Sequence, residues 1–431
     1  MSLDKKVVLN ASYLVKTKWN KWHEGEICAK RPIEDAQNIN VKEYFVHYKG
    51  LNRRYDEWIT LDKIDFNSYK DPYEDPEVIL LKAELDILEK SAETNKNILT
   101  RNRMKKRMSH KIARGEMVLN DLRKKARSDT ISATLEKEFK EFTKVKFITS
   151  VQLGKYIMDT WYFSPYPNAY GKSSNLFVCH ICLKYFKSKS TLYKHIMDCN
   201  NITPPGCQIY KHNNLALFEV DGEKYKLYSQ CLCLLGKLFI DQKTVYYDVD
   251  SFLFYLLFEI DHNNEKYQLV GYFSKEKESE DNNNIACIVV FPPFQKKGYG
   301  KFLIQISYEL SKREHIIGQP EKPLSYLGQK SYQCFWRWKI LQILDRYIHE
   351  NKNNNGESEC LINVNDISLE TSINREDILS TLDKLNLLNY WLNDSHTVCI
   401  PANQIRVIMN DSNLCKKPHI PIYPDCFIST I

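Results

Sequence analysis

The 431-residue chain has no long apolar segment and no recognisable leader. Its longest apolar run, residues 251–258, is too short to cross a membrane, and residues 1–10 carry charge and only a short apolar patch. We therefore expect neither a membrane span nor a secretory signal. Thirteen scattered cysteines in such a protein favour metal ligands or buried thiols in a reducing compartment over a disulfide framework.

The chain also lacks the two commonest phosphate-binding motifs. Neither the nucleotide P-loop pattern G-x-x-x-x-G-K-[ST] nor the six-residue dinucleotide fingerprint is present. These absences argue against an ordinary nucleotide-hydrolysing or dinucleotide-dependent enzyme.

Positive charge is scarce outside one stretch. The formal net charge is +7, but residues 101–127 alone carry eleven Lys and Arg against Glu116 and Asp121, a net of +9, which leaves about −2 for the rest. Residues 67–144 are predicted to be a charged linker with a helix over residues 78–88. Such a run is a solvated spacer, a contact for nucleic-acid phosphates, or both. The cluster Lys105-Lys106-Arg107 could also serve as a nuclear import signal.

The stretch from residue 284 to residue 336 organises the chain. Residues 285–291 are apolar and rich in β-branched side chains, which predicts a buried strand that ends at Pro292-Pro293. A basic loop with two glycines, residues 295–301, precedes a helix that runs to about residue 313. Free N–H groups at a helix start attract an anion, and glycines allow it to approach closely. This order predicts a diphosphate site.

A second motif has the spacing of a zinc site. Cys179, Cys182, His195 and Cys199 form the pattern C-x2-C-x12-H-x3-C, which suits a tetrahedral ion with three thiolates and one imidazole. Apolar residues between the ligand pairs predict the small core of a ββα finger. One finger alone is poorly suited to reading DNA sequence, so we expect a structural zinc.

The first 66 residues are predicted to form a small β-barrel. Strands are expected over residues 7–15 and 43–48 and from residue 56. The segment is dense in aromatic side chains: Trp19, Trp22, Tyr44, Tyr48, Tyr55 and Trp58. These side chains could fill the barrel core, or they could form a surface that receives a methylated lysine by cation–π attraction.

The remaining pattern predicts a mixed α+β core. Residues 215–220 and 224–228 are expected to pair as a hairpin, residues 229–238 to form a helix, and residues 245–249, 252–260 and 266–273 to form strands. Near the end, Asn374 is expected to cap a helix with Asp377 at its third position, after a short helix over residues 367–371.

The motifs Q-x-x-G-x-G-K, SYELSKRE and PEKPLS, with DTWYFSPYP upstream, resemble the MYST family of histone acetyltransferases from about residue 145 onward. The segment YFVHYKGLNRRYDEWI resembles the chromo-barrel of several such enzymes. The resemblance implies a chromo-barrel at 1–66, the linker at 67–144 and a catalytic domain at 145–431. Within that domain it implies a zinc finger at 179–199, an acetyl-CoA-binding and catalytic core at 284–336, and a winged-helix-like tail at 360–410. The implied fold class is α+β, with an acetyltransferase core of the GNAT type.

The resemblance also implies roles for single residues. Glu321 matches the general base, and Cys287 matches a cysteine beside the acyl site that could carry acetyl or merely line the site. The pantetheine arm is expected along Ile288, Val289 and Val290. The diphosphate is expected on Gln295, Lys296, Lys297, Gly298, Tyr299, Gly300 and Lys301, with a further cosubstrate contact from Ser325. Lys243 matches an autoacetylated lysine.

The resulting expectation is a nuclear histone lysine acetyltransferase that uses acetyl-CoA and acts on nucleosomes within a larger complex, with the tail of histone four as its commonest target. Two other classes stay open. One is a chromatin-binding adaptor, a reader of methyl-lysine or nucleic acid with an inactive core, which an intact Glu321 argues against. The other is an acetyltransferase for small amines or non-histone proteins, which the barrel argues against.

Overall fold

The computed structural model describes residues 7–32, 42–70, 145–199, 203–261, 266–355, 359–388, 390–392, 397–411 and 417–428. The chain divides into two compact units, Met1–Phe147 with Trp161–Phe163, and Ile148–Thr160 with Ser164–Ile431. The expected linker from residue 71 onward, including its helix and its basic cluster, lies outside the described residues. In the part of the chain that is described, no helix is long and apolar enough to span a bilayer.

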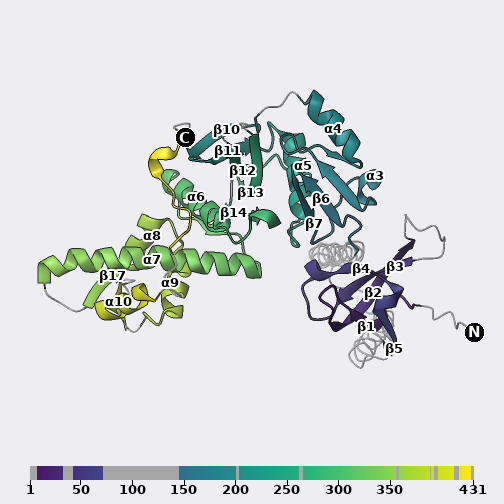
Figure 1. The fold of residues 1–431 in the computed structure, drawn as a ribbon. Coiled ribbons are helices and arrows are strands. Elements are labelled where there is room, and N and C mark those ends of the chain that lie inside the picture. The colour runs from purple at the N-terminus through teal and green to yellow at the C-terminus, as the bar shows by residue number, and fades with distance from the viewer. Residues whose placement is uncertain are drawn as a thin grey trace, which may run out of the picture. The chain divides into compact units, whose positions relative to one another are not determined.

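The first unit is built on a five-stranded antiparallel sheet in the order β4-β3-β2-β1-β5, drawn in purple in Figure 1. Its elements are β1 (Ser12–Lys16), β2 (Trp22–Pro32), β3 (Lys42–Tyr48), η1 (Arg53–Tyr55), β4 (Glu57–Thr60), η2 (Leu61–Lys63) and β5 (Ile64–Lys70). The sequence predicted β1, β3 and β4 but missed β2 and β5. In β2 only Gly25 and Ile27 are fully buried, so the strand carries almost no apolar signal.

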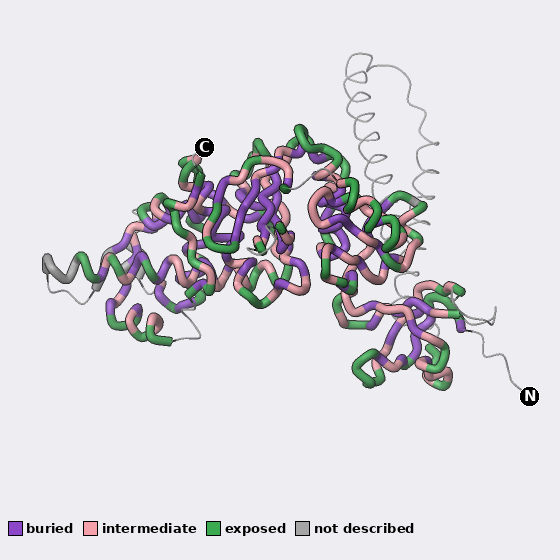
Figure 2. The backbone as a smooth tube through the Cα atoms, turned by 45° about the horizontal axis from the view of Figure 1, so that its top comes forward, coloured by how far each residue is buried: buried purple, intermediate pink, exposed green. Residues whose placement is uncertain are grey.

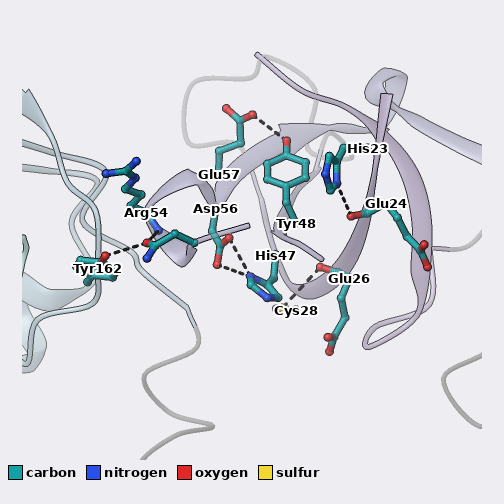
Figure 3. Close-up of polar contacts among 11 residues, drawn as sticks. His23, Glu24, Glu26, Cys28, His47, Tyr48, Arg54, Asp56, Glu57 and Tyr162 are labelled. Carbon is teal, nitrogen blue, oxygen red and sulfur yellow. Dashed lines mark hydrogen bonds and ion pairs between the residues drawn. The ribbon is translucent and has the colours of Figure 1, made fainter. Parts of the chain in front are cut away.

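Two polar pairs join β3 to the turn before β4 (Figure 3). His47 Nδ1 lies 3.0 Å from both carboxylate oxygens of Asp56, and Tyr48 donates from its hydroxyl to Glu57 Oε1 at 2.8 Å. Asp56 is almost fully buried, and this burial raises the pKa of its carboxyl, although His47 opposes the effect. The pairs satisfy polar groups that would otherwise be costly inside so small a barrel.

The second unit is organised by the sheet β10-β11-β12-β13-β15, whose neighbouring strands are all antiparallel. These strands form the buried interior of the unit in Figure 2. Their bounds are β10 (Cys207–His212), β11 (Leu215–Asp221), β12 (Phe252–Asp261), β13 (Lys266–Glu276) and β15 (Cys287–Val290).

Helices α5 (Lys226–Lys237) and α6 (Tyr299–Arg313) cover opposite faces of this sheet. Successive strand residues point to opposite faces. Tyr272 of β13 points to α5, where its hydroxyl leaves no room for a Cβ on Gly236. Lys275 points the other way and pairs with Glu314, the C-cap of α6.

Two strand predictions in this unit are wrong. Residues 224–228 do not return as a hairpin strand, because Asp221 Oδ1 accepts from the backbone N–H of Glu223 and turns the chain into α5. The partner of β11 is instead β10. Residues 245–249 form no strand either; they make a loop whose Val249 carbonyl lies so close to Gly222 that a Cβ there would clash.

The predicted strand over residues 285–291 is broken in two. The first part, β14 (Asn283–Ile285), pairs in parallel with β16 (Gln319–Pro320), whereas the second part is β15 of the main sheet. Ala286 lies at the change of partner and donates its N–H to Ser274 O at 2.8 Å. A short 3₁₀ turn, η3 (Pro292–Phe294), then leads to α6, as the two prolines predicted.

The N-terminal part of the second unit carries the predicted ββα finger. A four-stranded sheet has the order β7-β6-β8-β9. Its elements are β6 (Ser150–Leu153), β7 (Tyr156–Asp159), α3 (Asn168–Gly171), β8 (Asn175–Val178), β9 (Tyr185–Phe186) and α4 (Lys189–Asp198). Ser188 caps α4 by accepting from Thr191 N–H, and Leu192 is the buried side chain of that helix.

The C-terminal part is mostly helical and packs around one long helix. Its elements are α7 (Tyr326–Asn355), β17 (Glu359–Asn363), α8 (Val364–Thr371), α9 (Arg375–Lys384), β18 (Tyr390–Leu392), β19 (Thr397–Pro401), α10 (Ala402–Asn410) and η4 (Pro424–Cys426). Asn374 caps α9 as predicted, since its side-chain oxygen accepts from Glu376 N–H at 3.0 Å. Asp377 does not complete a capping box; it is buried and faces Lys322. The α+β prediction for the whole fold is confirmed.

The close approach of β13 and β15 makes Gly271 sensitive to added volume. A Cβ on Gly271 would lie 2.4 Å from the carbonyl oxygen of Val289, a backbone atom that cannot move aside. We expect Gly271→Ala to destabilise the protein by about 1–3 kcal/mol, the usual cost of overpacking, measured by urea unfolding. The matched control is Gly300→Ala, whose Cβ would meet only Val290 Cγ2 at 3.9 Å. Equal stability of the two variants would contradict this packing argument.

Candidate active site and metal centre

The predicted pantetheine-binding segment lies on an edge strand. β15, which contains Cys287 and the three residues after it, is the last strand of the main sheet and pairs on one side with β13. Alternate backbone groups of an edge strand point away from its neighbour and stay free for an extended ligand. Gln295 folds back on this strand, because its side-chain amide donates to Val290 O at 2.8 Å.

The loop from Gln295 to Lys301 has the backbone of an anion site. Lys296 (φ 62°) and Gly298 (φ 98°) adopt left-handed conformations, so the N–H groups of the loop turn toward one side. The first described bond of the α6 ladder runs from Phe302 N–H to Gly298 O, which leaves the N–H groups of residues 299–301 outside this ladder at the helix start. Lys296 and Lys297 are both accessible beside it.

Tyr299 is the one predicted loop residue that faces inward. Its hydroxyl donates a short hydrogen bond to Glu259 of β12, and its ring is buried. Burial first, and then this bond, raises the pKa of the phenol, so the hydroxyl stays protonated and keeps donating. Glu259 was not predicted, because nothing in its local sequence signals a partner that lies 40 positions away.

Glu321 follows β16 and lies next to the other strands of the site. Its backbone N–H donates to Ile285 O at 2.9 Å, one residue before the break that starts β15. Although Glu321 is exposed, desolvation of its carboxyl by neighbouring atoms is the main cause that raises its pKa; the negative charge of Glu276 adds to this, and Lys243 opposes it. A carboxylate with a raised pKa is the form that a general base at neutral pH requires.

The loop of Glu321 is fixed from the C-terminal part. Lys322 Nζ lies 3.4 Å from Asp377 Oδ1 and 3.9 Å from Glu376 Oε2, both in α9. Asn374 donates to Gln319 Oε1 at 3.2 Å. The charge of Lys322 is therefore directed toward α9, although it is next to Glu321 in the sequence.

Lys243 is buried, with 4% of its surface exposed, and is not the exposed turn residue that its polar surroundings in the sequence suggest. It donates a hydrogen bond to the thiol of Cys233 in α5, and Cys287 lies close to the same thiol. Burial raises the pKa of the Cys233 thiol. The structure thus brings Lys243, Cys233 and Cys287 together with Glu321, although they are far apart in the sequence.

Ser325 sits at the start of α7. Its hydroxyl oxygen accepts from Gly328 N–H at 3.1 Å, and its carbonyl accepts from Gln329 N–H at 2.7 Å. The side chain is exposed and its hydroxyl proton remains free to donate.

The four residues of the predicted metal motif form one cluster. The ligand atoms of Cys179, Cys182, His195 and Cys199 all lie within 4.8 Å of one another, and Cys182 Sγ is 3.1 Å from His195 Nε2. A hydrogen bond from Cys182 lowers the pKa of the Cys179 thiol to about 4, whereas the pKa of Cys182 is raised. Cys179 and Cys182 thus share a proton, and a divalent cation bound between them would replace that proton. The donor set therefore suits zinc.

The six aromatic residues of the barrel divide into different roles. Tyr44 and Tyr48 are buried in the core of the first unit. Arg31 lies 4.2 Å over the ring of Trp58, and Arg54 lies 4.6 Å over that of Tyr55. Of the six, Trp19 and Trp22 are the widely exposed ones, at 48% and 53%. Trp19 still packs edge-on against Tyr55, with ring centroids 5.3 Å apart, so at least five of the six rings contact groups of the chain itself.

Three family models match this chain. Residues 203–427 match the model described as the MOZ/SAS family, and residues 145–199 match the MYST family zinc finger domain. Residues 7–66 match a model described as the RNA binding activity-knot of a chromodomain.

Relatives from plants and animals match most of the chain. Histone acetyltransferase of the MYST family 1 from Arabidopsis thaliana is 42% identical over 383 residues, covering 88% of this chain and 77% of the relative. The histone acetyltransferase Tip60 homolog from Caenorhabditis elegans is 40% identical, covering 83% and 77%. Histone acetyltransferase MOF from Drosophila melanogaster is 35% identical over 91% of this chain and 49% of its own length.

An acetyltransferase core with a zinc finger and a barrel of the chromodomain type defines a lysine acetyltransferase of chromatin. The chain belongs to the MYST family, and it is a histone lysine acetyltransferase that uses acetyl-CoA and has a structural zinc. The predicted family, activity, cosubstrate and metal are confirmed.

The cluster geometry predicts one equivalent of zinc per chain. Metal analysis of the purified protein should find it, and Cys199→Ser should lower both the zinc content and the melting temperature, because metal binding contributes folding free energy. Cys207→Ser is the matched control, since Cys207 is an exposed cysteine outside the cluster. A folded, active protein without zinc would refute the site.

Proposed function

We propose that Glu321 is the general base that deprotonates the acceptor lysine for direct attack on the acetyl thioester. At neutral pH only roughly one free lysine in two thousand is uncharged, so the ammonium proton must be removed at the site. The observation that carries the proposal is the backbone bond from Glu321 to Ile285, which holds Glu321 beside the chain segment that leads into Cys287 and β15. Its raised pKa supports the same role.

The cosubstrate would lie along β15 and the start of α6. When bound, acetyl-CoA supplies the activated acetyl group as a thioester. The backbone groups of Ile288 to Val290 that β13 and Gln295 leave free would hold the pantetheine arm and polarise the thioester carbonyl. The loop from Gln295 to Lys301 would hold the diphosphate, supported by its left-handed residues and free N–H groups, with Ser325 as a further donor.

Cys287 would line the acyl site without carrying acetyl. It is half-buried on a strand and lies near a buried lysine, Lys243, and a second thiol, Cys233. No general base for Cys287 is needed when Glu321 can act on the acceptor amine directly. Lys243 would be the autoacetylated lysine, which its place near Glu321 supports, since its charge lowers the pKa of that carboxyl.

The finer biological assignments follow from the family and from charge. Core histone tails, above all the tail of histone four, would be the substrates on nucleosomes in the nucleus, within a larger complex. The catalytic part, residues 145–431, carries 31 Lys and Arg against 30 Asp and Glu, and this near-neutral charge is compatible with binding a basic tail. The basic residues 101–127 and the barrel would add contacts to DNA or RNA. The barrel match to an RNA-binding knot supports nucleic acid over methyl-lysine for that module.

Replacing the proposed base should separate binding from chemistry. Glu321→Gln should lower kcat on a histone-tail peptide by two to four powers of ten near neutral pH, roughly the worth of general base catalysis. Part of the rate should return at high pH, where more of the acceptor lysine is already neutral. The affinity for acetyl-CoA, measured by calorimetry, should change little. A variant with nearly full kcat would rule out Glu321 as the base.

The two routes for acetyl make opposite predictions for Cys287→Ala. With direct transfer, the variant keeps most of its kcat and the wild type follows ternary-complex kinetics. With an acetyl-cysteine intermediate, activity collapses and the wild type shows ping-pong kinetics. We expect the first result. An acetylated Cys287 that passes its acetyl to peptide at the turnover rate would overturn it.

A further inference from the structure

The end of β13 brings a second carboxylate to the face of the sheet that carries Cys287. Side chains alternate along a strand, so Tyr272, Ser274 and Glu276 share one face. Ser274 pairs directly with Cys287 on β15, which places the Cys287 side chain on that same face. Tyr272 identifies the face as the one covered by α5. Glu276 therefore lies on the side of the sheet where Cys233, Lys243 and Cys287 meet.

Glu276 has no counter-ion, although lysines flank it on both sides. Lys275 points to the opposite face and forms an ion pair with Glu314. Lys277 lies 2.9 Å from Asp221 Oδ1 and 3.4 Å from Glu223 Oε2. Within the part of the chain that the structure describes, no cation forms an ion pair with Glu276, which is half-buried. A half-buried carboxylate without a partner is costly and calls for an explanation.

The positive charge of the substrate lysine can explain why Glu276 has no ion-pair partner within the described chain. Glu276 is close enough to Glu321 for the two carboxylates to repel each other, which is why it raises the pKa of Glu321. Lys243 is the cation that acts on this pair from within the chain, and it is already bonded to the Cys233 thiol. Lys322 is directed toward α9. Glu276 and Glu321 together carry more negative charge than Lys243 balances, so the site attracts a further cation.

We propose that Glu276 is a positioning residue of the acceptor site, whose carboxylate attracts the cationic ε-ammonium of the histone lysine and guides it to Glu321. The ammonium proton passes to Glu321, the nitrogen lone pair then attacks the thioester carbonyl, and the C–S bond breaks so that coenzyme A leaves as its thiolate and takes up a proton. The proposal rests on Glu321 being the general base. It explains how the site can bind the acceptor lysine as its charged ammonium before Glu321 converts it to the neutral amine.

The effect on rate has two separable parts. Loss of the Glu276 charge weakens attraction of a cation, which raises KM for the peptide. It also removes the repulsion that raises the pKa of Glu321, so that pKa falls. The base is then ionised at lower pH, and the acidic limb of the kcat profile moves to lower pH. The other titratable groups on this face, Lys243, Cys233 and Cys287, are unchanged by the substitution.

The test is Glu276→Gln assayed with a histone-tail peptide and acetyl-CoA, beside the control Glu278→Gln. Glu278 is an exposed glutamate two residues further on, beyond the end of β13, so its variant has the same net charge. We expect Glu276→Gln to raise the peptide KM by about five- to tenfold, to shift the acidic limb to lower pH, and to leave acetyl-CoA affinity unchanged. Glu278→Gln should match the wild type. Identical KM values and pH profiles for the two variants would overturn the proposal.

Two further variants distinguish a failure of the role proposed for Glu276 from a failure of the general-base assignment of Glu321. Glu276→Asp retains the charge and should restore most of the pH profile, even if Glu276→Gln folds poorly by circular dichroism; an Asp variant that behaves like Gln would count against a role for the charge. Glu321→Gln, measured in parallel, should lose kcat and keep its KM. If Glu321→Gln instead keeps its kcat, the general base assignment fails, whereas a wild-type KM and pH limb in Glu276→Gln overturns only the role of Glu276.

Discussion

A single backbone hydrogen bond ties the two halves of the candidate active site together. Glu321 N–H donates to Ile285 O, and the next residue but one, Cys287, begins the strand that would hold the cosubstrate. The bond is possible because the chain changes partners at Ala286, which leaves β14 to pair in parallel with β16 while β15 joins the main sheet. If residues 285–291 formed one continuous strand, that strand would pair with β13 throughout, and Ile285 would not pair with β16. The break is thus what places Glu321 beside Ile285, two residues before Cys287.

Much of the remaining structure serves to hold that junction. Helix α9 fixes the loop after β16 through Lys322 and Asp377, and Asn374 both caps α9 and binds Gln319. Glu259 of the main sheet holds Tyr299 at the start of α6, which fixes the end of the loop proposed to bind the diphosphate. The helical tail therefore has a structural task at the loop of Glu321. Because these contacts combine ion pairs with hydrogen bonds, they fix both the orientation and the position of the residues that they hold.

The barrel and the catalytic part differ in how their charged groups are paired. In the barrel, aliphatic side chains together with Tyr13, Tyr44 and Tyr48 form a small core, and the buried carboxylate of Asp56 is matched by a neighbour, His47. At the catalytic face, by contrast, Glu276 and Glu321 remain without a counter-ion among the described residues. Unmatched charge is costly in a fold and useful in a site, because the substrate itself can supply the missing cation.

The sequence by itself determined the features that depend on neighbours along the chain. The spacing of Cys179, Cys182, His195 and Cys199 predicted the finger and its ion, Asn374 predicted the start of α9, and the glycine loop predicted the start of α6, because caps, turns and ligand pairs are local. Only the tertiary structure decided which strands pair. It turned residues 224–228 into a turn and the start of α5, broke the strand at Ala286, and buried Lys243 beside Cys233. It also joined Tyr299 to Glu259 and set Glu276 beside Glu321. These outcomes depend on contacts between residues tens of positions apart, where packing and paired charge outweigh local propensity.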